Sequence, residues 1–204
     1  DVQCRRHVYG RNEWKDLAAF FEQSCRTGDV LLTGYDLKIL LNYTSNIQCR
    51  VIPITDTYDG RDVTIAKVRE YQKQYPRIWS IFVNNYLRWA GDGRANWMDN
   101  TFIALAPISL NIHYWNREEA QRWESRPARR ASEIRLLKDF LAVAPNHYNA
   151  RRQLTGVLFA DGQYAASVEN AKRILAQYLL DSRNYLVPGV CYRDGLGVKR
   201  NLVK

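Results

Sequence analysis

The stretch Gly28-Asp29-Val30-Leu31-Leu32-Thr33-Gly34-Tyr35-Asp36 decides the fold that we predict for this chain. It reads as a short apolar strand, preceded by a Gly-Asp turn and followed by a Gly-Tyr-Asp turn. A helical pattern precedes the strand, with apolar residues at the spacing of one helix face: Trp14, Leu17, Ala18, Phe20 and Phe21. We therefore place this strand at the centre of a sheet.

Two further strands, 50–54 and 78–83, follow at similar intervals, each after a helical run. Strands that alternate with helices are typical of a parallel sheet with helices on both faces. Pro53 cannot donate to a strand ladder and so favours an edge position. Residues 101–105 and 108–115 read as a final antiparallel pair. For residues 1–116 we predict an α/β domain, Rossmann-like and three-layered, with a mostly parallel sheet.

The composition changes at Asn116. Residues 117–130 are rich in Glu and Arg and are interpreted as a linker, and residues 131–204 read as entirely helical. Short turns at 144–146 and 161–162 separate the helical stripes, which is typical of stacked helices. Because such helices bury their faces only on neighbours, we expect the stripe of Ile134, Leu137 and Leu141 to dock on the α/β part, against Trp115 or Trp123.

The helical part carries a family resemblance. Residues 137–146, followed by Leu154, Gly162, Tyr164 and Ala171, resemble a tetratricopeptide repeat, and residues 185–201 are similar to its Sel-type variant, with a Tyr-x-x-Gly-x-Gly-Val turn. The sequence departs from the pattern at Ser167, where a small Ala is expected, and at Pro188 inside a helix. The resemblance implies an all-α tetratricopeptide-like helical repeat segment over 131–204 that binds a protein partner.

The first part resembles a different family. Residues 14–20, Gly28-Asp29-Val30-Leu31-Leu32, Asn42-Tyr43 and Tyr75-Pro76-Arg77-Ile78-Trp79 are similar to the soluble exoplasmic tail of polytopic glycosyltransferases that use polyprenyl-phosphate sugars, as in protein-mannosyltransferase-like families. The resemblance covers residues 9–115. It implies a non-catalytic domain on the extracytoplasmic (periplasmic) face of a membrane, since the catalytic carboxylates of those families lie between transmembrane helices. Without the resemblance, a cytoplasmic location is expected.

The carboxyl rim of the sheet is the expected ligand site, because ligands of open α/β sheets bind outside the carboxyl ends of the strands. The candidate residues on that rim are Tyr35, Asp36, Asp56, Asp59, Asn84, Asn85, Tyr86 and Trp89. Aromatic rings beside Asn and Asp suit a glycan or a polyprenyl-linked sugar. The same residues would equally cover the rim against a neighbouring domain, and the Asp residues suit turn and capping chemistry.

Two of the four cysteines, Cys25 and Cys49, are expected at the same edge of the sheet, the amino ends of the strands. A disulfide and two buried free thiols both fit that placement. The cysteines lack C-x-x-C spacing and the three histidines are scattered, so no metal site is predicted.

The net charge of +9 suits a basic surface that faces anionic headgroups or solvent. No stripe of Lys and Arg interleaved with aromatics stands out, so nucleic acid is not a predicted partner. The sequence also lacks the Gly-x-Gly-x-x-Gly, Gly-Lys-Ser/Thr and Gly-x-Ser-x-Gly patterns, and no cofactor is predicted.

Three functions are therefore kept open. The leading hypothesis is a non-catalytic extracytoplasmic domain of a membrane glycosyltransferase that contributes acceptor or partner binding, reaching the membrane through segments upstream of Asp1. The first alternative is a soluble repeat-containing scaffold for protein interactions. The second is a small sugar- or nucleotide-binding enzyme.

Overall fold

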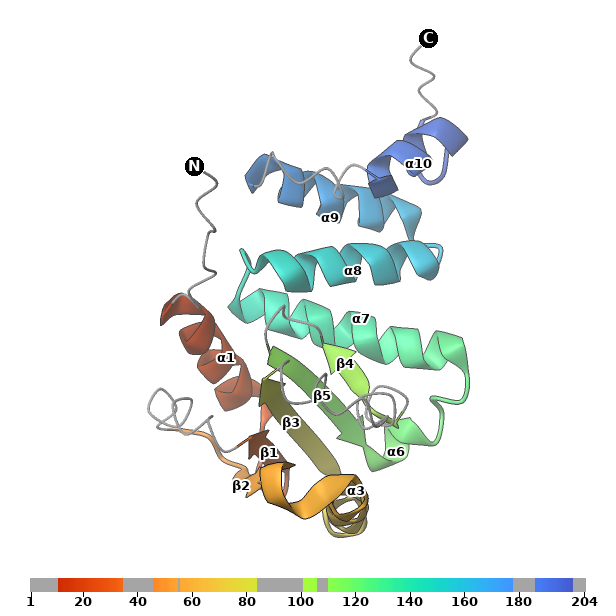
Figure 1. The fold of residues 1–204 in the computed structure, drawn as a ribbon. Helices are drawn as coiled ribbons and strands as arrows, with labels where there is room; N and C mark the ends of the chain where they lie inside the picture. Colours follow the sequence, from red (N-terminus) through yellow and green to blue (C-terminus); the bar gives the residue numbers. More distant parts are fainter. Residues whose placement is uncertain are drawn as a thin grey trace.

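The computed structural model describes residues 11–34, 46–54, 56–83, 101–105, 110–177 and 186–199. Its strands form one mixed sheet in the order β2-β1-β3-β5-β4 (Figure 1). The strands are β1 (Val30–Gly34), β2 (Arg50–Ile54), β3 (Arg77–Val83), β4 (Ile103–Leu105) and β5 (Leu110–Asn116). β1 runs parallel to both β2 and β3, whereas β5 runs antiparallel to both β3 and β4.

The parallel pairing of the first three strands is confirmed, as is the antiparallel pairing of the last two. Pro53 lies on β2, which is an edge strand as predicted. The prediction of a Rossmann-like sheet is wrong, because β5 pairs antiparallel along the whole of β3, from Arg77↔Asn116 to Val83↔Leu110. This long ladder puts β3, and not β1, in the middle of the sheet. A brief connection between β4 and β5 permits only antiparallel pairing, since parallel strands need a long crossover.

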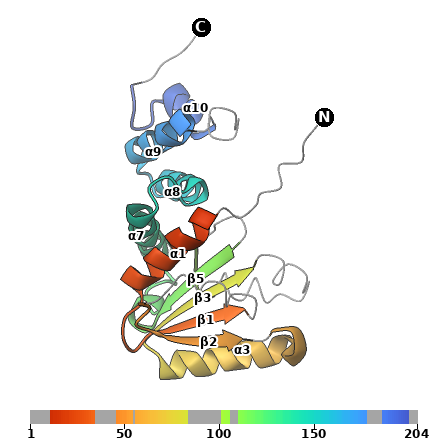
Figure 2. The same ribbon diagram turned by 90° about the vertical axis from the view of Figure 1, so that its left-hand side faces the viewer.

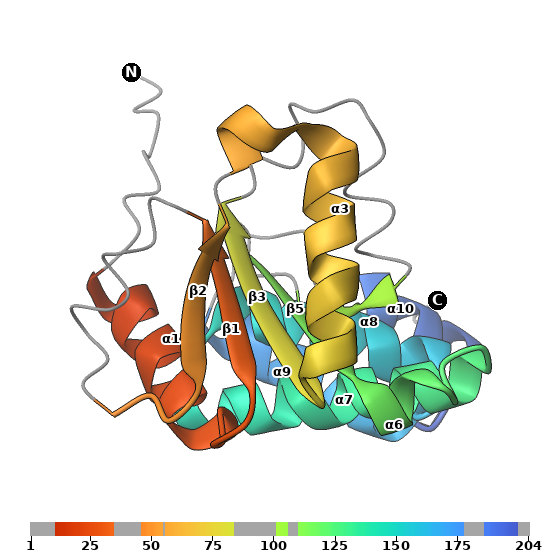
Figure 3. The same cartoon turned by 90° about the horizontal axis from the view of Figure 1, so that it is seen from below.

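Helices cover both faces of the sheet. α3 (Asp56–Gln74) lies on one face, and α1 (Arg11–Ser24) and α7 (Arg126–Val143) lie on the other (Figures 2 and 3). Phe20 of α1 meets Trp79 of β3 edge-on at 5.5 Å between ring centroids and Phe140 of α7 at 5.1 Å. One aromatic core therefore joins α1, the sheet and α7.

α3 begins earlier than the sequence indicated. The polar, turn-forming residues 55–61 predict a loop before the helix, but the helix starts at Asp56 and contains Gly60. Carboxylates in the first turn of a helix are favourable because the amino end of the helix carries partial positive charge. A glycine in the helix interior costs only about 1 kcal/mol, so the helix tolerates it.

The segment after β5 is helical in the part of the chain that the structure describes. Residues 117–130 hold α6 (Arg117–Ala120) and the start of α7. α8 (Tyr148–Ala160) then packs on α7, α9 (Tyr164–Gln177) on α8, and α10 (Leu186–Asp194) on α9 (Figure 1). The predicted docking is confirmed, because Ile134 and Leu137 belong to one continuous core with the sheet residues, Trp115 and Trp123.

The predicted tetratricopeptide-like repeat is wrong, since these helices show no repeating unit. Their lengths differ, with 18 residues in α7, 13 in α8, 14 in α9 and 9 in α10. α7 packs on β4 and α1 as well as on α8, so its apolar stripe serves the sheet. Ser167, which breaks the repeat pattern, is fully buried and donates its hydroxyl to the carbonyl of Thr155 at 2.8 Å. Within the described residues, no helix is both long enough and apolar enough to span a membrane.

Candidate functional site

The structure places two of the predicted rim residues. Asp56 and Asp59 lie in the first turns of α3, which begins directly after the carboxyl end of β2. Tyr35, Asp36, Asn84, Asn85, Tyr86 and Trp89 lie outside the described residues. The rim site therefore stays a prediction.

A pocket of about 230 Å³ lies at the opposite edge of the sheet, where β1 and β3 begin. We call it the basic pocket, because three of its lining side chains are arginines. Its lining residues are Gln23, Ser24, Arg26, Arg77, Trp79, Tyr114, Arg135, Leu136, Asp139 and Ala142. They come from the end of α1, the turn into β1, the start of β3, the end of β5 and the middle of α7.

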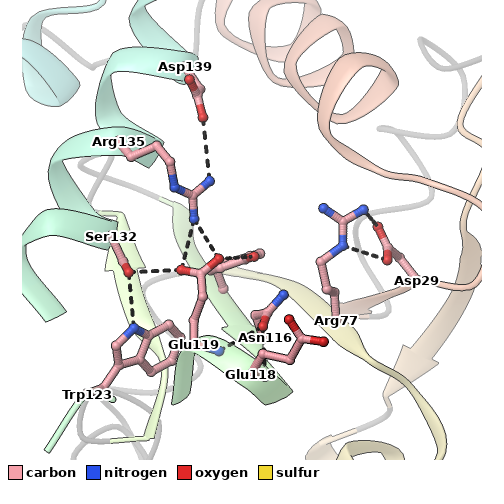
Figure 4. A network of polar contacts seen from close by, with 10 residues as sticks. Asp29, Arg77, Asn116, Glu118, Glu119, Trp123, Ser132, Arg135 and Asp139 are labelled. Carbon is pink, nitrogen blue, oxygen red and sulfur yellow. Dashed lines mark hydrogen bonds and ion pairs between the residues drawn. The ribbon is translucent and has the colours of Figure 1, made fainter. Parts of the chain in front are cut away.

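The turn that opens β1 fixes the first arginine. Gly28 has φ +92°, a backbone conformation that L side chains rarely adopt, and this tight turn lets Asp29 Oδ2 accept from the amide of Arg26 at 2.8 Å. The same carboxylate, only 3% exposed, accepts from Arg77 Nε at 2.8 Å and from Arg77 Nη2 at 2.5 Å (Figure 4). Burial alone would lower the pKa of Arg77, but the hydrogen bonds to Asp29 raise it. Arg77 is therefore held as a cation at the start of β3.

Glu119 fixes a second arginine. Its carboxylate accepts from Arg135 Nη2 at 2.8 and 2.9 Å and from the Ser132 hydroxyl at 2.8 Å (Figure 4). Tyr114 also donates its hydroxyl to Glu119, at 3.1 Å, and its ring lies 5.9 Å from the Arg135 guanidinium. Asn116 caps α6 by accepting from the amide of Glu119 at 2.9 Å, which sets the position of the whole group.

Trp79 brings a polar atom that lacks a partner. The residue is 2% exposed, and its indole Nε1 is buried with no hydrogen-bond acceptor among the described residues. Its ring is clamped, with centroid distances of 4.5 Å to Tyr114 and 5.8 Å to Phe21. An unpaired buried N–H costs about 1 to 3 kcal/mol, and the side chain that carries this one also lines the pocket.

The chemistry of the pocket favours an anion. A guanidinium has more N–H donors than one carboxylate accepts, so Arg77 and Arg135 keep donors beyond their ion pairs. Arg26 is exposed and adds a further positive charge to the lining, while Asp139, paired with Arg135 at 3.8 Å, adds a negative one. Carboxylates and phosphates are the groups that such donors bind best.

The positions of Asp29 and Arg77 in the sequence predict part of this site. Asp29 comes directly before β1 and Arg77 is the first residue of β3, and those two strands are parallel neighbours with Val30 opposite Ile78. Opposite charges at matching positions of neighbouring parallel strands predict an ion pair. The buried Trp79 follows two residues after Arg77, so a third pocket residue could have been placed as well.

Cys25 and Cys49 are both buried and free in this structure, and each thiol shifts the pKa of the other. In the ranges that the structure describes, His, Cys, Asp and Glu residues form no cluster that could hold a metal ion.

The chain matches no protein-family model, no curated protein and no solved structure. The fold and the pocket define a mixed α/β domain with a packed helical extension and a small basic pocket at the amino edge of its parallel strands.

Proposed function

We propose that this chain is a non-catalytic binding domain that holds one anionic group of its ligand in the basic pocket. The observation that carries the proposal is the buried, unpartnered Nε1 of Trp79 in a lining that also contains Arg26, Arg77 and Arg135. The indole N–H and the guanidinium groups are all hydrogen-bond donors, so an acceptor with negative charge satisfies them together.

The size of the pocket limits what enters it. Its volume of about 230 Å³ lies below the roughly 300 to 1,000 Å³ of pockets that hold whole drug-sized ligands. We therefore expect a single phosphate or carboxylate inside the pocket. The remainder of the ligand lies outside it.

The second proposal gives this binding domain a setting, as the extracytoplasmic domain of a membrane glycosyltransferase that contributes acceptor or partner binding. It is supported by residues that carry the family resemblance, because Arg77 and Trp79 line the pocket and Asp29 holds Arg77 in place. In that setting the phosphate of a polyprenyl-linked sugar is the expected anion, and the domain works on the periplasmic face. Transmembrane segments upstream of Asp1 in the complete gene test this setting independently of the pocket.

Binding of inorganic phosphate tests the pocket. We expect phosphate, compared with sodium chloride at the same ionic strength, to raise the Tm of the chain. A ligand at 100 times its Kd adds about 2.7 kcal/mol, which is about 5 to 10 °C for a chain of this size. Titration calorimetry then gives the Kd, and the same series with acetate compares a carboxylate with the phosphate.

Two variants locate the binding. Trp79→Phe keeps an aromatic ring but removes the N–H donor, and Arg26→Ala removes the exposed guanidinium, so each should weaken phosphate binding at least fivefold. Arg173→Ala on α9 removes the same charge outside the pocket lining and should bind like the unchanged chain. If Arg26→Ala and Arg173→Ala weaken binding equally, the effect is one of net charge and the pocket proposal is wrong.

A further inference from the structure

The chain brings two cysteines together at the amino edge of the sheet. The amide of Cys25 donates to the carbonyl of Phe21 at 2.9 Å, which closes α1, and the amide of Asp29 donates to the carbonyl of Arg26 at 3.0 Å, which turns the chain back. The amide of Arg50 then donates to the carbonyl of Asp29 at 3.2 Å. Cys49 directly precedes β2, so it lies beside this turn, where its side chain meets that of Cys25.

The two thiols differ in accessibility and acidity. Cys25 is 2% exposed and Cys49 is 8% exposed, so solvent reaches Cys49 more readily. The hydrogen bond to Cys49, together with burial, raises the pKa of the Cys25 thiol. The same hydrogen bond lowers the pKa of Cys49, although burial alone would raise it. Cys49 is therefore the better nucleophile, because the thiolate is the reactive form, and Cys25 holds the proton.

We propose that Cys25 and Cys49 form a redox-active pair that a small-molecule disulfide, such as oxidised glutathione, converts into an intramolecular disulfide. The Cys49 thiolate attacks one sulfur of glutathione disulfide and releases one glutathione thiolate, which leaves a mixed disulfide on Cys49. The Cys25 sulfur then attacks Cys49 Sγ, the second glutathione leaves, and it takes up the proton of Cys25. The protein loses two protons and two electrons, and one glutathione disulfide takes them up and becomes two thiols.

The cross-link would join the end of α1 to the edge strand β2. In the structure, α1 is held by its packing on the sheet and α7, while β2 pairs on one side only, with β1. A disulfide that closes a loop of this length restricts the unfolded chain, and for a chain of this size it should raise the Tm by about 6 to 12 °C. The proposal does not depend on what the basic pocket binds.

Mass spectrometry of the full chain tests the proposal. The reduced chain is treated with oxidised glutathione, unfolded in the presence of an alkylating reagent and digested without reductant. We expect a mass lower by about 2 Da and one cross-linked peptide pair that contains Cys25 and Cys49. Dithiothreitol should reverse the Tm increase. Recovery of both cysteines in alkylated form, or a cross-link to Cys4, would overturn the proposal.

Two cysteine variants separate this pair from general oxidation. Cys49→Ser should abolish both the mass loss and the Tm increase, whereas Cys191→Ala, which changes another fully buried cysteine on α10, should retain both changes. Cys25→Ser should leave Cys49 as a stable mixed disulfide with glutathione, because the second step has no thiol. Glutathione on Cys25 in the Cys49→Ser chain, at the rate seen for Cys49, would contradict the assigned roles.

Discussion

Two arginines show how differently the sheet and the helical extension hold a positive charge. At the start of β3, Arg77 makes a bidentate ion pair with the buried carboxylate of Asp29. These hydrogen bonds raise the pKa of Arg77. On α8, Arg151 is 8% exposed and donates to the carbonyl of Pro145 and to Asn170 Oδ1, and its Nε has no hydrogen-bond partner within the described ranges. Burial, followed by the charge of Arg173, lowers the pKa of Arg151.

The difference lies in what balances each charge. In the sheet, a carboxylate compensates Arg77, so that loss of Arg77 leaves the buried charge of Asp29 alone. In the extension, neutral oxygens satisfy Arg151, and among the described residues it has no ion pair. Arg151 belongs to a network in which Asn170 Nδ2 donates to Thr155 Oγ1 at 2.7 Å and to the Arg151 carbonyl at 2.7 Å. The sheet region uses paired charge, and the extension uses a neutral polar network.

The largest effect is expected when the helical extension is separated from the sheet. We expect the fragment 126–204, expressed alone, to show no cooperative thermal unfolding by circular dichroism. Three apolar side chains of α7 are each only 1–2% exposed because they lie in one core with the sheet: Leu136, Leu137 and Phe140. In the isolated fragment they would be exposed to solvent. A melt near that of the whole chain would show that the extension is an independent unit.

The next largest effect concerns the paired charge. Arg77→Met leaves the Asp29 carboxylate buried without its partner, which should lower the free energy of unfolding by about 3 to 5 kcal/mol in urea denaturation. The double variant Asp29→Leu/Arg77→Met removes both charges and should recover a large part of that loss. A single variant that loses less than about 1 kcal/mol would show that the pair contributes little.

The sequence predicted the parallel strands well, because β1, β2 and β3 are continuous apolar runs bounded by turns. It predicted β5 and its pairing with β4 but missed the ladder between β5 and β3, because that ladder joins segments far apart in the chain. The basic pocket was missed for a related reason. Its residues come from α1, β3, β5 and α7, so only the folded chain assembles them.

The basic composition also has a partly structural explanation that the sequence did not reveal. Arg117 Nη2 donates to the carbonyls of Gln72, Lys73 and Tyr75 at 3.1, 2.7 and 3.3 Å, at the end of α3. Arg130 Nη1 donates to the carbonyl of Ala160 at 2.7 Å, at the end of α8. Cations at helix carboxyl ends satisfy free carbonyls and the helix dipole. Part of the positive charge therefore caps helices and is not a binding surface.

A smaller effect is expected where the charge is unpaired. Arg151→Met removes the cation from α8 and leaves Asn170 Oδ1 and the Pro145 carbonyl without this donor, but it strands no opposite charge. The expected loss is about 1 to 2 kcal/mol, clearly less than for Arg77→Met, measured in the same urea series. Equal losses for the two variants would contradict the comparison of paired and unpaired charge.

The smallest expected effect is a pH dependence at the start of α8. His147 is the N-cap of that helix, and its Nδ1 accepts from the amide of Ala150 at 3.3 Å, which requires an unprotonated nitrogen. Burial lowers the pKa of His147, and the charge of Asp16 opposes this only in part. The unfolded chain, with a pKa of about 6.5, therefore binds more protons as the pH falls below that value, and the folded state loses stability.

His147→Asn keeps a side-chain acceptor at the N-cap but cannot titrate. The free energy of unfolding should fall less between pH 7.5 and pH 5.5 in this variant than in the unchanged chain, and one titrating site limits the difference to about 1.4 kcal/mol per pH unit. Burial raises the pKa of Asp16 and the charge of His147 lowers it, so the comparison reports on His147 together with its effect on Asp16. If the variant loses as much stability on acidification as the unchanged chain, the N-cap of α8 at His147 does not cause the pH dependence.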